Sequence, residues 1–146
     1  MQTLVIGHAA VTWILVGLIL TVQIVHYPLF AKVGAAGFAA YEAAHSTRIT
    51  PLVMPLMCIE LVLAAALAYS TPAAIPQWSA HAGLALVIAI WLSTFFLQVP
   101  QHAILARGWD AQAHAVLVAT TWVRTVAWLL RGGIGAWWGS AIVTRG

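Results

Sequence analysis

The chain contains few charged residues and almost no cysteine. Only 6% of its 146 residues are Asp, Glu, Lys or Arg, and the formal net charge is +3. So small a charge, with no basic run, excludes a nucleic-acid-binding surface, which needs clustered Lys and Arg. The single cysteine, Cys58, excludes an intramolecular disulfide and leaves the redox compartment open.

Hydrophobic residues take the place of the missing charges. They make up 63% of the chain and give a mean hydropathy of +0.97, whereas apolar residues are about 45–50% of a soluble domain. Because a membrane-spanning helix needs about 20 apolar residues, a chain of this length has room for four spans. The apolar runs occupy residues 9–25, 52–69, 82–99 and 115–130. The sequence therefore predicts an integral membrane protein whose main partner is the lipid bilayer.

The connections between these runs are short and contain Gly or Pro, which interrupt helices. Short connections make neighbouring helices antiparallel. The predicted fold class is an all-α, four-transmembrane-helix up-down-up-down bundle. It forms one domain over residues 1–146, with helices near 3–33, 37–70, 77–107 and 110–143.

Basic residues predict the orientation in the membrane. Lys32, Arg48 and Arg107 lie in or beside the first and third connections, and the second connection has no Lys or Arg. By the positive-inside rule, the first and third connections face the cytoplasm and both termini lie outside it. We expect the protein in a bacterial inner membrane.

Polar residues concentrate at this cytoplasmic level. The stretch "YEAAHSTRI" places Glu42 and His45 three residues apart, so that both lie on one helix face. All four helices supply polar side chains at the same level, which predicts a polar chamber. A Glu-x-x-His pair joined by His from facing helices is typical of di-iron and di-manganese bundles, and imidazole with carboxylate also suits zinc or copper. The candidate metal ligands are His26, Glu42, His45, His102 and His114, and the expected cofactor is a transition metal ion (iron, copper or zinc).

Two charged residues lie well inside apolar runs, where a central charge costs about 2.5–3.5 kcal/mol. Glu60 and Arg124 lie at similar depths measured from the edges of their runs, which predicts that they pair, with Arg131 as the rival partner of Glu60. Such a pair either fixes helix register or takes part in function. The candidate catalytic residues are Glu42, Glu60 and Arg124.

Four short motifs carry a resemblance to a known family. "VHYPLF" at 25–30, "RITPLVMPLM" at 48–57, "VPQHAIL" at 99–105 and "LVATTWVRTVAW" at 117–128 resemble the pattern of a family of small four-helix membrane proteins that includes fungal anthrone oxygenases. The matching positions are Pro28, Arg48, Pro51, Pro100, Trp122 and Arg124. The resemblance implies a four-helix fold and oxidation of a hydrophobic substrate. The clustered histidines depart from the family pattern, and anthrone oxygenases are not usually described as metal enzymes.

Three functions are therefore open. The first is a membrane oxidoreductase or oxygenase with a metal in the His/carboxylate cluster and a hydrophobic small-molecule substrate. The second is a b-type haem or quinone electron carrier, because the first and third helices each carry a His near both ends; His8 and His26, 18 residues apart, are expected on one helix face. The third is a channel, transporter or helper subunit with a proton or ion path. If the chain is an enzyme, it is an oxidoreductase. The Gly-rich "RGGIGAWWG" at 131–139 also leaves a homo-oligomer open.

Overall fold

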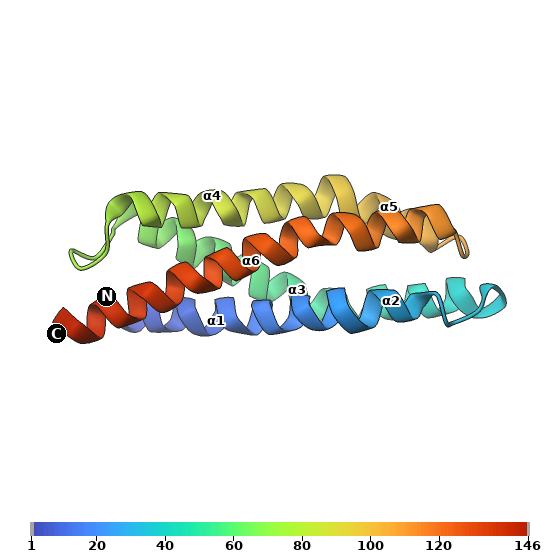
Figure 1. Cartoon of the computed structure of the whole chain (residues 1–146), viewed down its shortest axis with the longest axis horizontal. Helices are drawn as coiled ribbons and strands as arrows, with labels where there is room; N and C mark the ends of the chain where they lie inside the picture. The colour runs from blue at the N-terminus through green and yellow to red at the C-terminus, as the bar shows by residue number, and fades with distance from the viewer. Residues whose placement is uncertain (1, 146) are drawn as a thin grey trace.

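The computed structural model describes residues 2–145, and side chains as far as residue 142. It is all-helical, and four long apolar helices pack as an antiparallel bundle (Figure 1), which confirms the predicted fold class. The helical segments, in chain order, are α1 (Gln2–Thr21), η1 (Val22–His26), α2 (Tyr27–Phe30), η2 (Ala35–Gly37), α3 (Phe38–Tyr69), α4 (Gln77–Ser93), η3 (Thr94–Gln98), α5 (Val99–Leu105) and α6 (Ala111–Arg145).

The bundle has two distinct ends. The connections that follow α2 and α5 lie together at one end, which we call the loop end, and both termini lie with the α3–α4 connection at the other, the terminal end (Figure 1). Gly34 and Gly108 in the two loop-end connections have φ of 87° and 147°. Only glycine adopts these φ angles without strain. The two glycines therefore allow the chain to reverse direction tightly in both connections.

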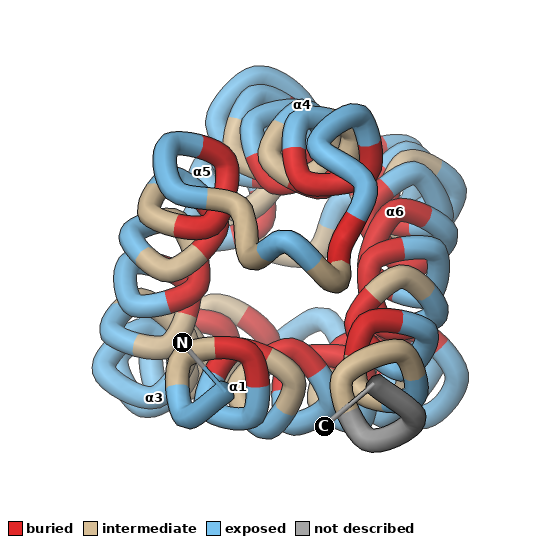
Figure 2. The backbone as a smooth tube through the Cα atoms, turned by 90° about the vertical axis from the view of Figure 1, so that its left-hand side faces the viewer, coloured by how far each residue is buried: buried red, intermediate tan, exposed pale blue. Residues whose placement is uncertain are grey.

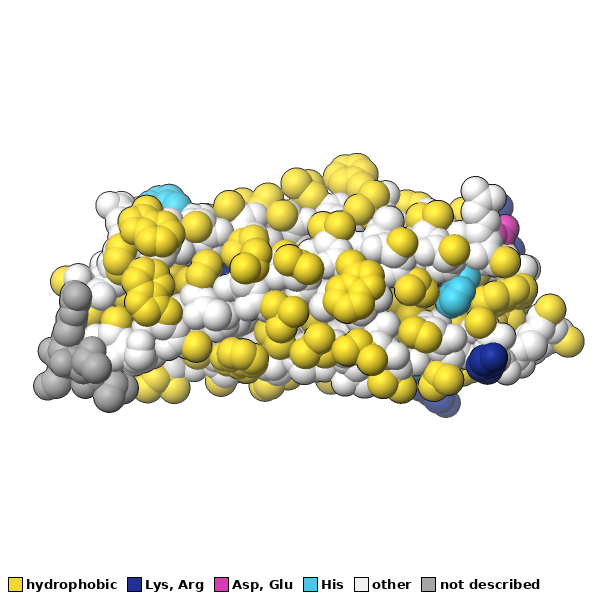
Figure 3. Space-filling view, viewed as in Figure 1, with side chains coloured by type: hydrophobic (Ala, Val, Ile, Leu, Met, Phe, Trp, Pro, Cys, Tyr) yellow, Lys and Arg dark blue, Asp and Glu magenta, His cyan; other side chains and the backbone are white. Residues whose placement is uncertain are grey.

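The burial pattern is that of a membrane protein. Buried residues face the middle of the bundle (Figure 2), and they include polar side chains such as Gln23, Gln98 and Thr121. Large hydrophobic side chains cover the outside: Ile24 is 60% exposed and Phe96 73%. The visible face carries hydrophobic side chains along its whole length (Figure 3). Four helices are long and apolar enough to cross a bilayer, so the chain is an integral membrane protein.

The first and third long helices each contain a π-helical segment followed by a proline. In η1 the N–H of Tyr27 bonds the carbonyl of Val22, and in η3 the N–H of Val99 bonds the carbonyl of Thr94. Pro28 and Pro100 follow directly. Proline lacks the N–H that an α-helix would use, and π-helical segments occur mostly as single-turn bulges inside α-helices. By contrast, α3 runs without a break through both of its prolines.

Candidate functional site

Buried ionisable groups gather in two places, one toward each end of the bundle. The loop-end cluster consists of His26, Tyr27, Glu42, His45 and His102, and the terminal-end cluster of His8, Thr12, Glu60 and Arg131. Each cluster contains one carboxylate and at least one imidazole. Their hydrogen bonding differs, and the loop-end cluster borders a cavity.

A carboxylate, an imidazole and a phenol form a linear relay in the loop-end cluster. Glu42 is fully buried, and its Oε1 lies 2.6 Å from His102 Nδ1 and accepts a hydrogen bond of 3.0 Å from the Ser46 hydroxyl. The other ring nitrogen, His102 Nε2, lies 2.9 Å from the Tyr27 hydroxyl. With Glu42 ionised, Nδ1 carries the hydrogen, so Nε2 accepts the hydrogen bond of the phenol.

Local structure explains why these side chains meet. Tyr27 is the first residue after η1, and His102 lies on α5, four residues after η3 ends. Both therefore take their direction from a π segment and the proline beside it. Glu42 comes from the first turns of α3 on the facing side of the bundle. Each residue of the relay therefore comes from a different long helix of the bundle.

A pair of histidines leads from this relay to the surface. His26 Nε2 lies 2.8 Å from His45 Nδ1, and the His45 and His102 rings stack with centroids 5.8 Å apart. His26 and His45 are half-buried and line a pocket of about 350 Å³ together with Tyr41 and Arg48. Imidazoles both accept and donate protons, and here His26 and His45 share a hydrogen bond, whereas His45 and His102 are joined by ring contact alone.

A cavity of about 460 Å³ lies beside the relay. Its polar lining includes Tyr27, His45, His102 and Arg124, and the remainder is largely aliphatic and aromatic. Phe95 and Val99 also line it and are 51% and 48% exposed, so the cavity reaches the outer surface of the bundle beside η3 and α5. Since lipid covers that surface in a membrane, an apolar molecule has a lateral route to the relay. The volume falls in the range of about 300–1,000 Å³ that is usual for small-molecule sites.

Arg124 projects into this cavity without an acidic partner. The residue is 9% exposed, its Nη1 donates a 3.2 Å hydrogen bond to the Thr94 hydroxyl, and it interacts with Tyr27. Its Nε is buried with no hydrogen-bond acceptor. Within the described residues, no Asp or Glu forms an ion pair with it.

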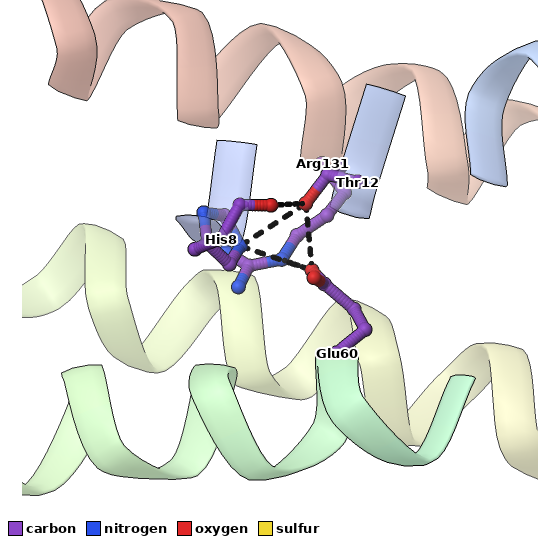
Figure 4. A network of polar contacts seen from close by, with 4 residues as sticks. All are labelled: His8, Thr12, Glu60 and Arg131. Carbon is purple, nitrogen blue, oxygen red and sulfur yellow. Dashed lines mark hydrogen bonds and ion pairs between the residues drawn. The ribbon is translucent and has the colours of Figure 1, made fainter. Parts of the chain in front are cut away.

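The predicted Glu60–Arg124 pair is wrong. In the terminal-end cluster, Glu60 Oε1 accepts hydrogen bonds from Arg131 Nε at 3.0 Å and from the Thr12 hydroxyl at 2.9 Å, and it lies 2.9 Å from His8 Nε2 (Figure 4). The error comes from the depth estimate. It used the apolar run at 115–130, but α6 continues to Arg145, so the middle of the run is not the middle of the helix.

The five predicted metal ligands separate into two groups. His26, Glu42, His45 and His102 lie in one cluster, whereas His114 Nε2 bonds the backbone carbonyl of Tyr27 at 2.8 Å. Across the described part of the chain, no three His, Cys, Asp or Glu side chains are placed to hold one metal ion. The donors bond one another in sequence rather than converging on a point. Metal binding therefore stays a prediction.

The histidines expected near haem have protein partners. His8 bonds Glu60 and His26 bonds His45, while His81 is exposed and bonds the carbonyl of Gln77 in its own helix. The haem alternative likewise stays a prediction. We find no feature of the site that favours it.

The residues that sequence reasoning missed are mainly hydroxyl groups. Thr12, Ser46 and Thr94 each donate or accept one hydrogen bond with Glu60, Glu42 and Arg124 respectively. Ser46 lies four residues after Glu42 and Thr12 four after His8, and this spacing places each on the face of its partner. Thr94 has no such signal, because its partner is on another helix.

Comparison with protein-family models, with curated proteins and with solved structures finds no match to this chain. The class that the fold defines is an integral membrane four-helix bundle. The site adds a lateral cavity that borders a buried Glu–His–Tyr relay. The likeness to anthrone oxygenases rests on the sequence motifs alone.

Proposed function

We propose that this protein is a membrane-embedded oxidoreductase that acts on a hydrophobic small molecule entering its cavity from the bilayer. The observation that carries the proposal is the Glu42–His102–Tyr27 relay, since both Tyr27 and His102 line that cavity. A buried carboxylate that orients an imidazole is the arrangement by which many enzymes create a general base. The relay supports proton removal from a bound substrate.

The order of the hydrogen bonds in the relay determines how one proton moves through it. The substrate gives a proton to the Tyr27 oxygen as the phenol proton moves to His102 Nε2, and the imidazolium that forms is stabilised by the carboxylate of Glu42. His45 and His26 then offer a route for the proton to leave. The substrate remains as an anion, which loses electrons to an oxidant such as O₂ more readily than its neutral parent does. The oxidation itself is what the family resemblance implies.

The proposal includes an orientation. The loop end faces the cytoplasm of a bacterial inner membrane, supported by Lys32, Arg48 and Arg107 at or beside its connections. The proton route through His26 then opens on the cytoplasmic side. Reporter fusions to each end of the chain test this orientation.

Turnover of a hydrophobic probe tests the acid–base role. We expect membranes containing the wild-type protein to consume O₂ with anthrone, and His102→Gln to lower the rate by about 10²–10⁴-fold, as loss of a general base does. His81→Gln is the matched control, because it makes the same change at an exposed site near the terminal end. Tyr27→Phe is expected to lower the rate as well. Equal rates in His102→Gln and wild type would rule out the relay as the base.

Elemental analysis and an absorption spectrum test the predicted cofactor. A stoichiometric transition metal that is lost from His45→Ala and His102→Ala would place a metal at the loop-end cluster. A Soret band would instead favour the haem alternative. In either case the order of hydrogen bonds in the relay changes, because a nitrogen bound to a metal no longer accepts from Tyr27.

A further inference from the structure

Among the described residues, no Asp or Glu pairs with the charge of Arg124. A guanidinium keeps its proton under nearly all conditions, and moving such a charge out of water costs several kcal/mol unless an opposite charge or hydrogen bonds compensate. Arg124 has the Thr94 hydroxyl and Tyr27 beside it, and a buried Nε without an acceptor. The other buried arginine, Arg131, bonds directly to Glu60.

The surroundings of Arg124 have the shape and chemistry of an anion site. It supplies the only Lys or Arg side chain among the residues that line the 460 Å³ cavity, and no Asp or Glu lines it. The remaining walls are formed mainly by apolar residues such as Ile19, Met57 and Trp128. A molecule that matches both the charge of Arg124 and the apolar walls has one negatively charged oxygen group attached to an apolar body.

The depth of Arg124 in the bundle further restricts the class of molecule that the cavity accepts. Arg124 follows Ala111, the first residue of α6, by 13 residues, which is about 20 Å along the helix axis. A phospholipid headgroup is held at the membrane surface and does not reach this depth. The occupant is therefore a free small molecule that crosses the hydrocarbon region in its neutral form.

We propose that the cavity binds an apolar weak acid, which enters protonated and is held as its oxyanion by Arg124. This inference rests on the proposed function in one respect, since the relay takes up the proton. The O–H bond of the acid breaks, the proton passes through Tyr27 to His102 Nε2, and the negative oxygen remains beside the guanidinium. No electron is transferred in this step.

Competition binding with matched probes tests the inference. The full-length protein, purified in a neutral detergent, is incubated with radiolabelled dodecanoic acid, and saturable binding is measured by a scintillation proximity assay. Unlabelled dodecanoic acid is expected to displace the label, and dodecanol, which has the same chain without the acid, to compete at least about tenfold more weakly. This comparison needs no variant and so does not depend on how a mutant folds.

Variants of Arg124 then test whether its charge is the one that binds dodecanoate. Arg124→Gln is expected to weaken dodecanoate binding at least about tenfold, and Arg124→Lys to retain part of it. Arg107→Gln is the matched control, because it removes the same charge from an exposed residue that lines neither the cavity nor the pocket at His26 and His45, and it is expected to leave binding unchanged. Saturable binding that is absent in the wild type, equal competition by dodecanol, or full binding in a folded Arg124→Gln would each overturn the inference.

Binding and turnover separate this inference from the proposed function. His102→Gln is expected to keep its preference for dodecanoate over dodecanol, because Arg124 is intact. If that preference holds while no probe is turned over, the proposed enzyme fails and the acid site stands. If anthrone is turned over through His102 while dodecanoate does not bind, only the acid site fails.

Discussion

The two buried arginines lie on the same helix but in opposite electrostatic surroundings. Arg131 is fully buried and shares Glu60 with His8 and Thr12 in the terminal-end cluster. Arg124 bonds a threonine hydroxyl and borders a cavity. The first arrangement pairs the charge with a carboxylate, although Arg131 Nη1 and Nη2 are buried without an acceptor, and the second leaves the charge without an acidic partner beside a cavity. The comparison supports the proposal that Arg124, rather than Arg131, holds a ligand.

The close packing around Arg131 supports this division. A Cβ added at Gly83 would lie 2.1 Å from Arg131 Nη1, so the guanidinium occupies the space of a missing side chain on α4. Its Cζ also lies 5.2 Å from the centre of the Trp138 ring, in cation–π range. The guanidinium of Arg131 is thus packed between α4 and Trp138, whereas that of Arg124 borders the 460 Å³ cavity.

The largest effect is expected from breaking the Glu60–Arg131 pair. Arg131→Gln leaves the Glu60 charge buried without its cation and is expected to destabilise the protein by about 3–5 kcal/mol. Unfolding in a detergent titration, followed by circular dichroism, measures the change. A loss as small as that of Arg124→Gln would remove the distinction between the two arginines.

A methyl group added at Gly83 tests how tightly the guanidinium of Arg131 is held. Gly83→Ala is expected to cost about 1–3 kcal/mol, because the new methyl group displaces the guanidinium of Arg131. Gly133→Ala is the matched control on α6, where an added Cβ meets nothing within 4 Å. The same unfolding titration compares the two. Equal stability of both variants would mean that Arg131 moves aside without losing Glu60.

A single hydrogen bond at the terminal end gives a smaller effect. The indole N–H of Trp138 donates to the Ser79 hydroxyl at 2.9 Å, and both residues are buried. Trp138→Phe keeps an aromatic ring but loses this bond and part of the indole contact with Arg131, with an expected cost of about 1–2 kcal/mol. Trp137→Phe, at a neighbouring residue that is 43% exposed, is the control and is expected to change stability less.

The smallest effect on stability is expected at Arg124. Arg124→Gln removes a charge that has no acidic partner, so the unfolding free energy is expected to stay within about 1 kcal/mol of the wild type or to rise. Thermal unfolding without added ligand is the measurement. A loss of several kcal/mol would show that Arg124 belongs to the structural framework rather than to a binding site.

Hydropathy was sufficient to predict the bundle but not the pairing inside it. The apolar runs gave four helices, since only helix length and side-chain polarity decide a membrane span. Arg124 and Arg131 are seven residues apart, which is about two turns, so both lie on one face of α6. Their shared helix face therefore does not determine which of the two arginines pairs with Glu60. The choice depends on how far α6 extends past its apolar run, and the predicted depth was measured on the run at 115–130 instead of on the predicted helix at 110–143.

The loop-end cluster was predicted in part. Charge and imidazole content identified Glu42, His26, His45 and His102 as neighbours, because each helix places its polar residues at the same level. Their order was not predictable, since it depends on side-chain direction across three helices. Asp110, the acidic residue nearest the start of the fourth long helix, accepts a hydrogen bond from the backbone N–H of Ala113 and so caps α6.

The π segments have a further consequence for how the site is specified. Each residue turns an α-helix by about 100°, so one extra residue within a turn shifts the rotational phase of everything that follows it. The 18-residue spacing that would align His8 with His26 spans η1, and His8 is fully buried while His26 is partly exposed. Deleting one residue from Val22–His26 would reset this phase and turn Tyr27 away from His102. Chain length at this point, and not residue identity alone, decides which side chains reach the cavity.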